Sequence, residues 1–375
     1  MASAKESPRF GILGGGQLAR MLAQAAQRLD VRTEVWDADR VCPAASSALV
    51  HPEAMEKEAA LACGLFTLES ENVGLERLRQ LEAWGCHCAP KADVLAALQD
   101  KVAQKELLAG LGAKLPAFEV VESVGALQAF GQSQGWPVVL KKRTGGYDGR
   151  GNATVHRSEE AEAAWELLGG RGLYVEAFCP FERELAIQVV RGRDGERKSY
   201  PLVDSVQENH ICKVVTAPSE VPESLAQEAR DLAYALVEEI EYVGVLAVEF
   251  FLTSDGFLWV NEVAPRVHNS GHYTMDATAC GQFENHVRAI LGWPLGDTRL
   301  WQPAAMVNVL GDGDGRGFPR GVAQALAVPG ARLHLYGKAR ARAGRKMGHV
   351  NALAASASEA RERAEKAANS LTFVS

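Results

Sequence analysis

The sequence predicts an α/β protein with two or three domains. Its 375 residues are enough for about two or three domains of ordinary size. A strand, a glycine turn, a helix and a second strand follow one another over residues 9–37, as at the start of an α/β unit. One domain boundary is placed near residue 95, at the start of a helical segment, and another near residue 300, after a turn-rich stretch. We therefore expect domains over residues 1–95, 96–300 and 301–375.

The composition excludes several classes of protein. Hydrophobic residues make up 47% and charged residues 23% of the chain, as in ordinary globular proteins. The 47 acidic and 40 basic residues give a net charge of −7, whereas a dedicated nucleic-acid binder would be strongly basic. We expect neither a membrane span nor a secretory signal, because no apolar run is long enough. The seven scattered cysteines indicate reduced thiols in a cytoplasmic protein. From the charge and the lack of a long apolar run, we expect neither nucleic-acid nor membrane partners.

The first glycine turn matches a dinucleotide-binding fingerprint. Gly14, Gly16 and Ala19 have its spacing in the alanine form. Asp37 stands 21 residues after Gly16, where a ribose-binding acid is expected. Taken alone, this pattern predicts a Rossmann-like domain in an NAD-linked oxidoreductase. A glycine turn also occurs wherever the backbone must approach another group closely, so this function is kept as an alternative to the nucleotide signals that follow.

Three further segments have a recognisable secondary-structure pattern. Residues 91–111, rich in alanine, leucine, lysine and glutamine, are predicted to be helical. Residues 356–370 are predicted to form an amphipathic helix with a charged, solvated face. Residues 173–178 are predicted to form a strand that contains Glu176. On the residues alone, Glu176 is only an acid near the end of a strand.

A strand that ends in a lysine leads into a glycine-rich loop. The strand spans residues 137–141, and the loop over residues 142–151 lacks the Gly-Lys-Ser/Thr ending of a Walker motif. Glycines in such a loop can present backbone N–H groups to phosphate oxygens. The basic side chains around it would repel one another unless an anion lay among them. We therefore predict a phosphate-binding loop rather than a mobile hairpin. Its glycines and basic residues are Lys141, Lys142, Arg143, Gly145, Gly146, Gly149, Arg150 and Gly151.

Two glutamates are predicted to face each other across a hairpin. Apolar strands flank Asp255-Gly256, which is a strong hairpin signal. A two-residue turn there places Glu249 directly opposite Glu262, and a four-residue loop leaves them diagonal on the same face. Opposed like charges among apolar neighbours are destabilising. A divalent cation removes this conflict, so the pair is predicted to bind Mg²⁺.

The lysine-ended strand, the glycine loop and the glutamate pair together resemble the ATP-grasp superfamily. Four longer motifs, over residues 145–151, 180–184, 261–272 and 344–349, look like those of the N5-carboxyaminoimidazole ribonucleotide synthetases, the ATP-dependent carboxylases of purine synthesis. The resemblance covers nearly the whole chain. It implies a three-domain architecture with a Rossmann-like N-terminal domain, a central ATP-grasp domain and a small C-terminal domain that helps to bind the substrate phosphate.

The resemblance also implies a reaction. ATP, bicarbonate and 5-aminoimidazole ribonucleotide would give ADP, phosphate and N5-carboxyaminoimidazole ribonucleotide through carboxyphosphate, with Mg²⁺ as the metal. The loop over residues 147–151 would act as a lid that excludes water. The family further implies a homodimer.

The same resemblance assigns the ATP site. Two lysines would hold ATP phosphates, the segment after residue 175 would bind adenine through its backbone, and Glu184 would bind the ribose. Glu249 and Glu262 would carry Mg²⁺. The implied ATP contacts are Lys101, Lys141, Gly146, Gly149, Gly151, Glu176, Ala177, Phe178, Cys179, Glu184, His210, Asn261 and Glu262.

It likewise assigns the aminoimidazole ribonucleotide site. The implied catalytic residues are Tyr147, Asp148, Arg150, Arg266 and His268. The implied substrate contacts are Gln17, Glu71, Tyr147, Arg150, Arg266, His268, Asn269, Lys338 and Arg345. Cations in the basic run over residues 338–346 suit a 5′-phosphate, because arginine binds phosphate with two parallel hydrogen bonds. The alternatives for that run are a solvated basic face or an RNA-binding patch.

Three alternatives for the function stay open at this point. Another ATP-grasp ligase, such as a formate-dependent glycinamide ribonucleotide transformylase or a biotin carboxylase, would keep the Glu249–Glu262 pair but differ over residues 266–272. A non-enzymatic regulator with a decayed nucleotide site is disfavoured, because the expected lysines and acids are present. The NAD-linked oxidoreductase depends on the N-terminal glycine motif alone.

Overall fold

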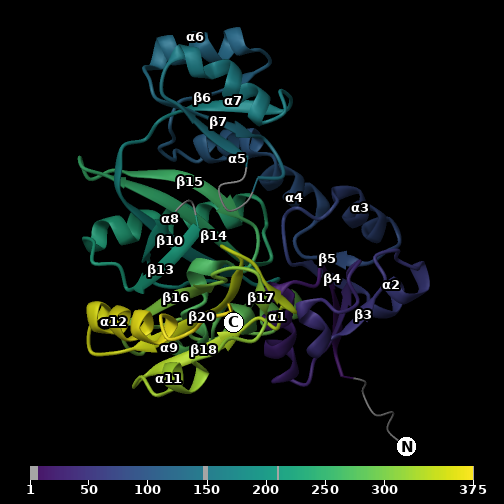
Figure 1. Cartoon of the computed structure of the whole chain (residues 1–375). Helices are drawn as coiled ribbons and strands as arrows, with labels where there is room; N and C mark the ends of the chain where they lie inside the picture. The colour runs from purple at the N-terminus through teal and green to yellow at the C-terminus, as the bar shows by residue number, and fades with distance from the viewer. Residues whose placement is uncertain (1–6, 147–150, 209–210, 375) are drawn as a thin grey trace, which may run out of the picture.

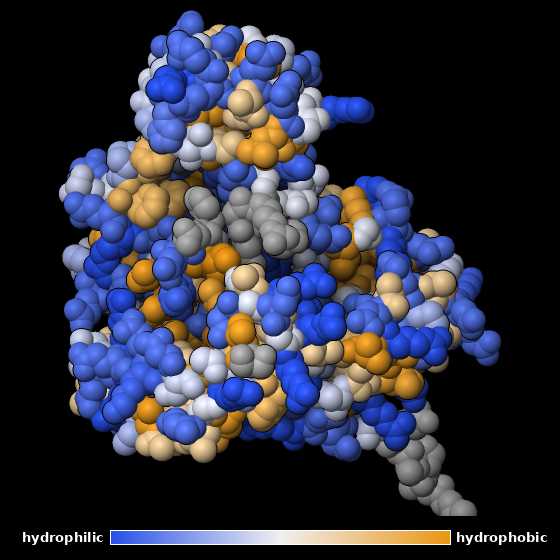
Figure 2. Space-filling view, viewed as in Figure 1, coloured by the Kyte–Doolittle hydropathy of each residue, from blue (hydrophilic) through white to orange (hydrophobic). Residues whose placement is uncertain are grey.

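The computed structural model describes residues 7–146, 151–208 and 211–374. In this part of the chain, the strands form a five-stranded, a four-stranded and a nine-stranded sheet and a small two-stranded one. Figure 1 shows the four-stranded sheet and its helices as a lobe above the rest of the molecule. The lobe also projects in the space-filling view, where its outer surface is largely hydrophilic (Figure 2). The predicted α/β fold class is confirmed.

The N-terminal part is built on a parallel sheet. Its five strands lie in the order β3-β2-β1-β4-β5, and all of their pairings are parallel. The first strand is buried and apolar, as expected of a sheet covered on both faces. This confirms the Rossmann-like unit. Its elements are β1 (Arg9–Leu13), α1 (Gln17–Gln27), β2 (Arg32–Trp36), the 3₁₀ helix η1 (Pro43–Ser46), β3 (Leu49–His51), α2 (Lys57–Cys63), β4 (Leu65–Leu68), α3 (Leu75–Ala83), β5 (His87–Cys88) and α4 (Ala92–Gln99).

The glycine turn between β1 and α1 is filled by carboxylates of the chain itself. Asp37 Oδ2 accepts a hydrogen bond from the Gly15 N–H at 2.6 Å. Glu69 accepts from the Gly16 N–H at 2.5 Å and from the Leu18 N–H at 3.2 Å. The acid that the fingerprint assigned to a cofactor ribose therefore binds the turn, and a second acid caps the helix N-terminus that a pyrophosphate would need. This corrects the interpretation of Asp37 as a ribose ligand.

The segment predicted as one helix over residues 91–111 is two helices. α4 ends at Gln99, and α5 (Lys101–Gly110) begins after Asp100, whose backbone is extended. The Asp100 side chain accepts hydrogen bonds from the Val102 and Ala103 N–H groups, so it caps α5. The same carboxylate binds the Arg143 guanidinium through two nitrogens, at 3.0 and 2.5 Å. Asp100, at the break between the two helices, therefore links the start of α5 to Arg143 in the loop that follows β7.

The four-stranded sheet carries the predicted phosphate loop. Its order is β6-β9-β7-β8, with antiparallel pairing, and the apolar sides of α6 and α7 pack against it. Gly146 and Gly151 bring the two ends of the loop together, because a Cβ atom on Gly151 would lie 3.3 Å from the Gly146 Cα. The elements are β6 (Phe118–Val121), α6 (Val124–Gln134), β7 (Val138–Lys142), β8 (Asn152–Val155), the 3₁₀ helix η2 (Ser158–Glu160), α7 (Ala161–Leu167) and β9 (Leu173–Ala177).

The nine-stranded sheet joins the central and C-terminal parts of the chain. Its order is β15-β14-β10-β12-β13-β16-β20-β18, with β11 beside β10, so the C-terminal strands extend the central sheet. The strands are β10 (Phe181–Arg191), β11 (Arg197–Ser199), β12 (Val203–Glu208), β13 (Ile211–Ala217), β14 (Gly244–Thr253), β15 (Leu258–Ala264), β16 (Ala304–Leu310), β18 (Ala331–Leu335) and β20 (Lys346–Leu353). The remaining elements are α8 (Glu223–Glu239), the 3₁₀ helix η3 (Asn269–Gly271), α9 (Thr274–Ala277), α10 (Gln282–Leu291), β17 (Gly315–Arg316), α11 (Val322–Leu326), β19 (Arg340–Ala341) and α12 (Ala357–Ala368). α12 confirms the predicted C-terminal amphipathic helix.

The β14–β15 hairpin reaches the predicted register by another route. The Thr253 N–H donates to the Phe257 carbonyl, which closes a three-residue loop rather than the predicted two-residue or four-residue one. That loop alone would shift the pairing by one residue. A β-bulge skips Asn261, so Glu249 pairs with Glu262. The loop prediction was wrong, but the predicted opposition of the two glutamates is confirmed.

Gly16→Ala is expected to lower the free energy of unfolding by about 1–3 kcal/mol. A Cβ atom there would lie 2.1 Å from Glu69 Oε1, so the carboxylate that caps α1 must move. Chemical denaturation would measure the loss. Gly74→Ala is the matched control, because a Cβ atom at Gly74 meets nothing within 4 Å. Equal stability of the two variants would contradict this role for Glu69.

Candidate functional site

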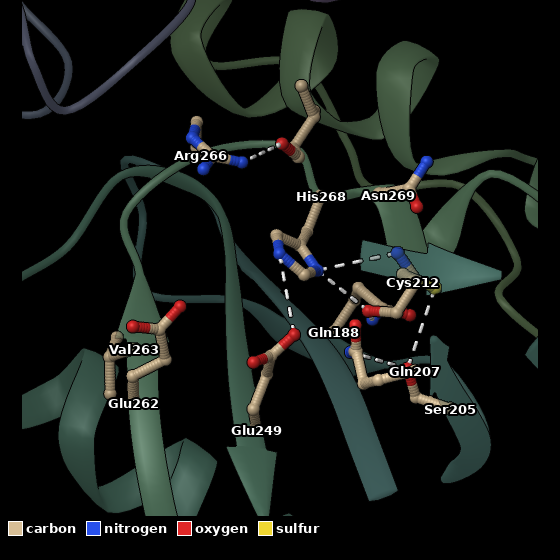
Figure 3. Close-up of polar contacts among 12 residues, drawn as sticks. Gln188, Ser205, Gln207, Cys212, Glu249, Glu262, Val263, Arg266, His268 and Asn269 are labelled. Carbon is tan, nitrogen blue, oxygen red and sulfur yellow. Dashed lines mark hydrogen bonds and ion pairs between the residues drawn. The ribbon is translucent and has the colours of Figure 1, made fainter. Parts of the chain in front are cut away.

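Glu249 and Glu262 stand side by side on β14 and β15. Figure 3 shows both carboxylates pointing into the same space, below Arg266 and His268. The Lys101 Nζ lies 3.1 Å from Glu262 Oε2, and the His268 Nε2 lies 3.6 Å from Glu249 Oε1. These contacts join the start of α5, the central hairpin and the loop after β15. The structure thus brings together residues that the sequence could only assign one at a time.

The electrostatics of this cluster favour a bound cation. Burial and the neighbouring Glu262 carboxylate raise the pKa of Glu249 to about 8. Burial would lower the pKa of Lys101, but nearby Glu262 and Glu71 raise it above its ordinary value. In the described residues, no group of three or more His, Cys, Asp or Glu side chains could hold a metal unaided. A pair of carboxylates is nevertheless what Mg²⁺ needs when substrate phosphates supply its other ligands.

Arg266 and Glu71 form a two-pronged ion pair between the central sheet and the N-terminal unit. The guanidinium Nε and Nη2 donate to the two carboxylate oxygens of Glu71 at 2.5 and 3.1 Å. Burial would raise the pKa of Glu71, but the Arg266 charge and hydrogen bonds lower it to about 2. Both residues are predicted contacts of the ribonucleotide, and here each is the partner of the other.

A second charged cluster surrounds Glu176 on β9. Lys141 Nζ, at the end of β7, lies 2.8 Å from Glu176 Oε2, and Lys105 Nζ, on α5, lies 2.9 Å from Glu176 Oε1. Burial would raise the pKa of Glu176, but the two lysines hold it at about 2. Since one carboxylate faces two ammonium groups, the cluster keeps a surplus positive charge that suits a phosphate.

Lys105 is a site residue that the sequence reasoning missed. Its side chain is only 2% exposed, and burial lowers its pKa. The helical spacing could have revealed it: Lys105 lies four residues after Lys101 in a predicted helix, so both side chains project from the same face. Lys101 reaches Glu262 on the nine-stranded sheet, while Lys105 reaches Glu176 on the four-stranded one. One face of α5 therefore bridges the two sheets.

The predicted adenine contacts follow Glu176 in the chain, whereas the predicted ribose contact, Glu184, acts electrostatically on Glu249 of the first cluster. Phe178 and Cys179 directly follow β9, where Phe178 is exposed and Cys179 is half-buried. Glu184 lies on β10 opposite Phe251 of β14. Burial raises the pKa of Glu184 to about 7, although a hydrogen bond with Gln207 lowers it in part. A carboxyl group with this pKa is partly protonated near neutral pH, so it can both donate hydrogen bonds to hydroxyl groups, such as those of a ribose, and accept them.

Lys338, one of the two predicted contacts of the substrate phosphate, lies where the N-terminal and C-terminal parts meet. Gly337 packs against the Arg20 guanidinium of α1, the helix that Gln17 begins. Next to it, Lys338 donates to the Lys346 carbonyl at 2.6 Å. Figure 1 shows α1 close to the C-terminal strands. The structure thus places the residue next to Lys338 against the Arg20 side chain of α1.

Other predicted residues are held by the chain or lie outside its described part. Exposed Arg345 donates to the Arg340 carbonyl at 2.9 Å. Asn269 exchanges two hydrogen bonds with Asn308 of β16, at 3.1 and 2.6 Å. Asn261 is the extra residue of the β-bulge in β15, directly before Glu262. The predicted residues outside the described part are Tyr147, Asp148, Gly149, Arg150 and His210.

Three family models match successive parts of the chain. The ribonucleotide synthetase preATP-grasp domain matches residues 8–99, and the ATP-grasp domain matches residues 106–283. The phosphoribosylaminoimidazole carboxylase C-terminal domain matches residues 304–363. No helix in the described chain has both the length and the apolar character needed to cross a bilayer.

Known proteins resemble the chain over nearly its full length. The N5-carboxyaminoimidazole ribonucleotide synthase of Synechococcus elongatus is 41% identical over 372 residues, which are 97% of this chain and 94% of that protein. The Thermus thermophilus synthetase structure has 39% identity and a TM-score of 0.87, covering 96% of this chain and 98% of that one. The Aspergillus clavatus synthase, solved with ADP and 5-aminoimidazole ribonucleotide, has 35% identity and a TM-score of 0.87, covering 97% and 98% of the two chains.

Glu71→Gln is expected to lower the free energy of unfolding at neutral pH by about 3 kcal/mol, because it leaves the Arg266 charge unpaired. The pKa of Glu71 is about 2 in the folded chain, against an ordinary value of 4.5. The wild-type advantage is therefore complete above about pH 4.5 and shrinks as the pH falls toward 2. Denaturation at several pH values checks this. Glu76→Gln, at an exposed ion pair in the same unit, should change little. A loss for Glu71→Gln that does not vary with pH would contradict the assignment.

Proposed function

Because the chain belongs to the N5-carboxyaminoimidazole ribonucleotide synthase family, we propose that it carboxylates 5-aminoimidazole ribonucleotide with ATP and bicarbonate in purine biosynthesis. The observation that carries the proposal is the joining of two charged clusters by one face of α5. One cluster is the opposed Glu249–Glu262 pair with Lys101, and the other is Glu176 with its two lysines. A paired-carboxylate site next to surplus positive charge suits a nucleotide triphosphate with its metal.

ATP is proposed to bind between these clusters. Lys101 and Lys141 would turn from their carboxylates toward the phosphates, and Lys105 would stay on Glu176, so that this buried acid keeps a partner. Glu249 and Glu262 would hold Mg²⁺, which when bound neutralises phosphate charge and polarises the transferred phosphoryl group. Glu176, Ala177, Phe178 and Cys179 would receive the adenine, and Glu184 the ribose.

The chemistry follows from the weak reactivity of bicarbonate. Transfer of the γ-phosphoryl group of ATP to bicarbonate gives carboxyphosphate, which is activated for attack by the amine of the ribonucleotide. The transferred group is negatively charged, so lysine ammonium groups beside it stabilise the transition state. Carboxyphosphate reacts readily with water, so the site must exclude solvent while the amine attacks.

The ribonucleotide is proposed to bind where the N-terminal unit, the loop after β15 and the C-terminal segment meet. Its base would lie near Arg266 and His268, and its phosphate near Lys338 and Arg345. Support comes from the Arg266–Glu71 ion pair and from Gly337 against α1, which bring these parts of the chain together. Gln17 and Asn269 would complete this side of the site, as would the predicted residues outside the described chain.

We also propose domain boundaries near residues 95 and 300, a homodimer and a cytoplasmic location. The domain proposal is supported by the separate N-terminal sheet and by the start of β16 at Ala304. The assembly follows from the family alone, and the location from the scattered cysteines. Light scattering at two protein concentrations tests the dimer.

The function itself is tested by measuring ADP release with bicarbonate, with and without 5-aminoimidazole ribonucleotide. Release that depends on this ribonucleotide, with formation of its N5-carboxylated product, supports the proposal. Stimulation by glycinamide ribonucleotide with formate instead would favour another ATP-grasp ligase. Micromolar binding of NAD would instead favour the oxidoreductase function. The glycine turn argues against it, because Asp37 and Glu69 already accept the hydrogen bonds of its N–H groups.

Glu249→Gln or Glu262→Gln is expected to lower kcat about a hundredfold or more, because a metal carboxylate is lost. The fold should be as stable as in the wild type or slightly more so, since a like-charge pair is removed. Steady-state kinetics against Mg²⁺ concentration and thermal denaturation measure the two effects. Glu228→Gln, on the exposed side of α8, is the control. Near-normal turnover in either site variant would contradict the metal assignment.

Arg345→Ala is expected to raise the Michaelis constant for 5-aminoimidazole ribonucleotide about tenfold to a hundredfold, through loss of a charge-assisted hydrogen bond to phosphate. The constant for ATP should barely change, because Arg345 lies outside both ATP clusters. Arg342→Ala removes an exposed arginine from the same basic run and serves as the control. A rise in the ATP constant of equal size would show that the two anion sites are not separate.

A further inference from the structure

His268 has different surroundings at its two ring nitrogens. Its Nδ1 lies 2.8 Å from the Ser270 Oγ and 3.4 Å from the Ser270 backbone nitrogen. Its Nε2 lies 3.6 Å from Glu249 Oε1 (Figure 3). The ring therefore links a buried serine on one side to the carboxylate pair on the other.

The contacts of Ser270 determine which nitrogen carries the proton. The backbone N–H of Ser270 can only donate, so it points a hydrogen at Nδ1. The Ser270 Oγ accepts a hydrogen bond from the Gln188 Nε2 at 2.8 Å, so its own hydroxyl hydrogen is available to donate to the ring. The backbone donor requires a lone pair at Nδ1, so the neutral ring carries its hydrogen on Nε2, and the Ser270 hydroxyl then donates to the same Nδ1 lone pair. Gln188 and Ser270 are 0% and 1% exposed, so bulk water does not compete.

The backbone of His268 is fixed independently of the ring. The Gln282 Oε1 accepts from the His268 N–H at 2.9 Å, and the Gln282 Nε2 donates to the His268 carbonyl at 2.7 Å. The Gln282 side chain is fully buried at the start of α10. A Cβ atom on Gly271 would lie 2.7 Å from its amide oxygen, so the loop fits closely around this glutamine. Gln282 holds the His268 backbone and Ser270 contacts Nδ1, so the ring is oriented with Nε2 toward Glu249.

We propose that Gln188 and Ser270 are positioning residues that hold His268 as a hydrogen-bond donor toward the carboxylate-lined centre. This rests on the proposed carboxylation, which brings anionic oxygens of bicarbonate and carboxyphosphate to that centre. An N–H group aimed at such an oxygen stabilises its charge without a proton transfer. In this tautomer, Nε2 has no lone pair, so His268 is not the base that accepts the proton of the substrate amine.

A second buried histidine provides an internal reference. The Val245 N–H donates to the His286 Nδ1 at 3.0 Å, and the Thr67 Oγ1, which donates to the Ala89 carbonyl, lies 2.8 Å from the His286 Nε2. These contacts give His286 the same tautomer by the same logic. It stands on α10, where it contacts β4 of the N-terminal unit.

The first experiment is nitrogen NMR of the imidazole rings in ¹⁵N-histidine-labelled full-length protein, with assignments from His268→Gln and His286→Gln. In the wild type, His268 should match the His286 pattern, with a pyridine-like Nδ1 and a pyrrole-like Nε2. Gln188→Glu places a carboxylate against the Ser270 hydroxyl and turns that hydroxyl away from the ring. The Ser270 backbone N–H still donates to Nδ1, so the ring hydrogen should stay on Nε2, but the Nδ1 signal should shift because one of its two donors is lost. A wild-type His268 with its hydrogen on Nδ1 would overturn the proposal, whatever the enzyme's activity.

The second experiment is steady-state kinetics on Ser270→Ala and Gln188→Glu. Ser270→Ala keeps the backbone donor and introduces no charge, so it tests the proposal even if Gln188→Glu does not fold. Both variants should lower the ribonucleotide-dependent kcat about tenfold, with the ATP Michaelis constant unchanged. Loss of activity with an unchanged His268 spectrum would overturn the positioning role.

Thr67→Val is the matched control, because it removes a buried hydroxyl from a histidine that the proposal does not use. It should alter the His286 spectrum and the thermal stability but leave the His268 spectrum and the kinetics unchanged. The spectra require no substrate, so they test the tautomer even if wild-type enzyme shows no ribonucleotide-dependent ADP release. That result would count against the proposed function, whereas the wrong wild-type tautomer would count against this inference alone.

Discussion

The register of the β14–β15 hairpin is the constraint on which the rest of the site depends. It sets two glutamates against each other among buried neighbours, where repulsion and lost hydration raise the pKa of Glu249. Nitrogen groups of other elements approach the two carboxylates. Lys101 approaches one carboxylate and the His268 ring faces the other. A single shift in register would move one of the acids to the opposite face of the sheet and remove the reason for these neighbours.

The short helix α5 carries this arrangement from one sheet to the other. Asp100 breaks what would be a longer helix, caps α5 and binds Arg143 beyond β7. From that fixed start, Lys101 and Lys105 project from the same face, one turn apart, toward acids on different sheets. The positive charge of one helix face thereby connects the two sheets and lies where we propose that the triphosphate binds.

Distant ion pairs and hydrogen bonds account for what the sequence reasoning missed. Glu71 and Arg266 are 195 positions apart, and Gln188 and Ser270 are 82 apart, so no local pattern could show that they meet. Asp37 had the spacing of a ribose ligand, but it binds the Gly15 N–H, because spacing fixes where a residue lies in the chain and not which donor it finds. Lys105 could have been found from its helical spacing, although not its burial or its acid partner.

The sequence by itself determined the α/β class, the glycine turns, the strand that leads from Lys141 into a glycine-rich loop, and the hairpin that carries Glu249 and Glu262 on its two strands. Each of these depends on neighbours in the chain, on strand alternation or on the chemistry of glycine. Only the tertiary structure decided that the C-terminal strands extend the central sheet, that Glu69 caps α1 and that a β-bulge restores the hairpin register. These features depend on which distant donors and acceptors are buried together. A buried polar group must find a partner wherever the fold places one, and that choice is made in space rather than along the chain.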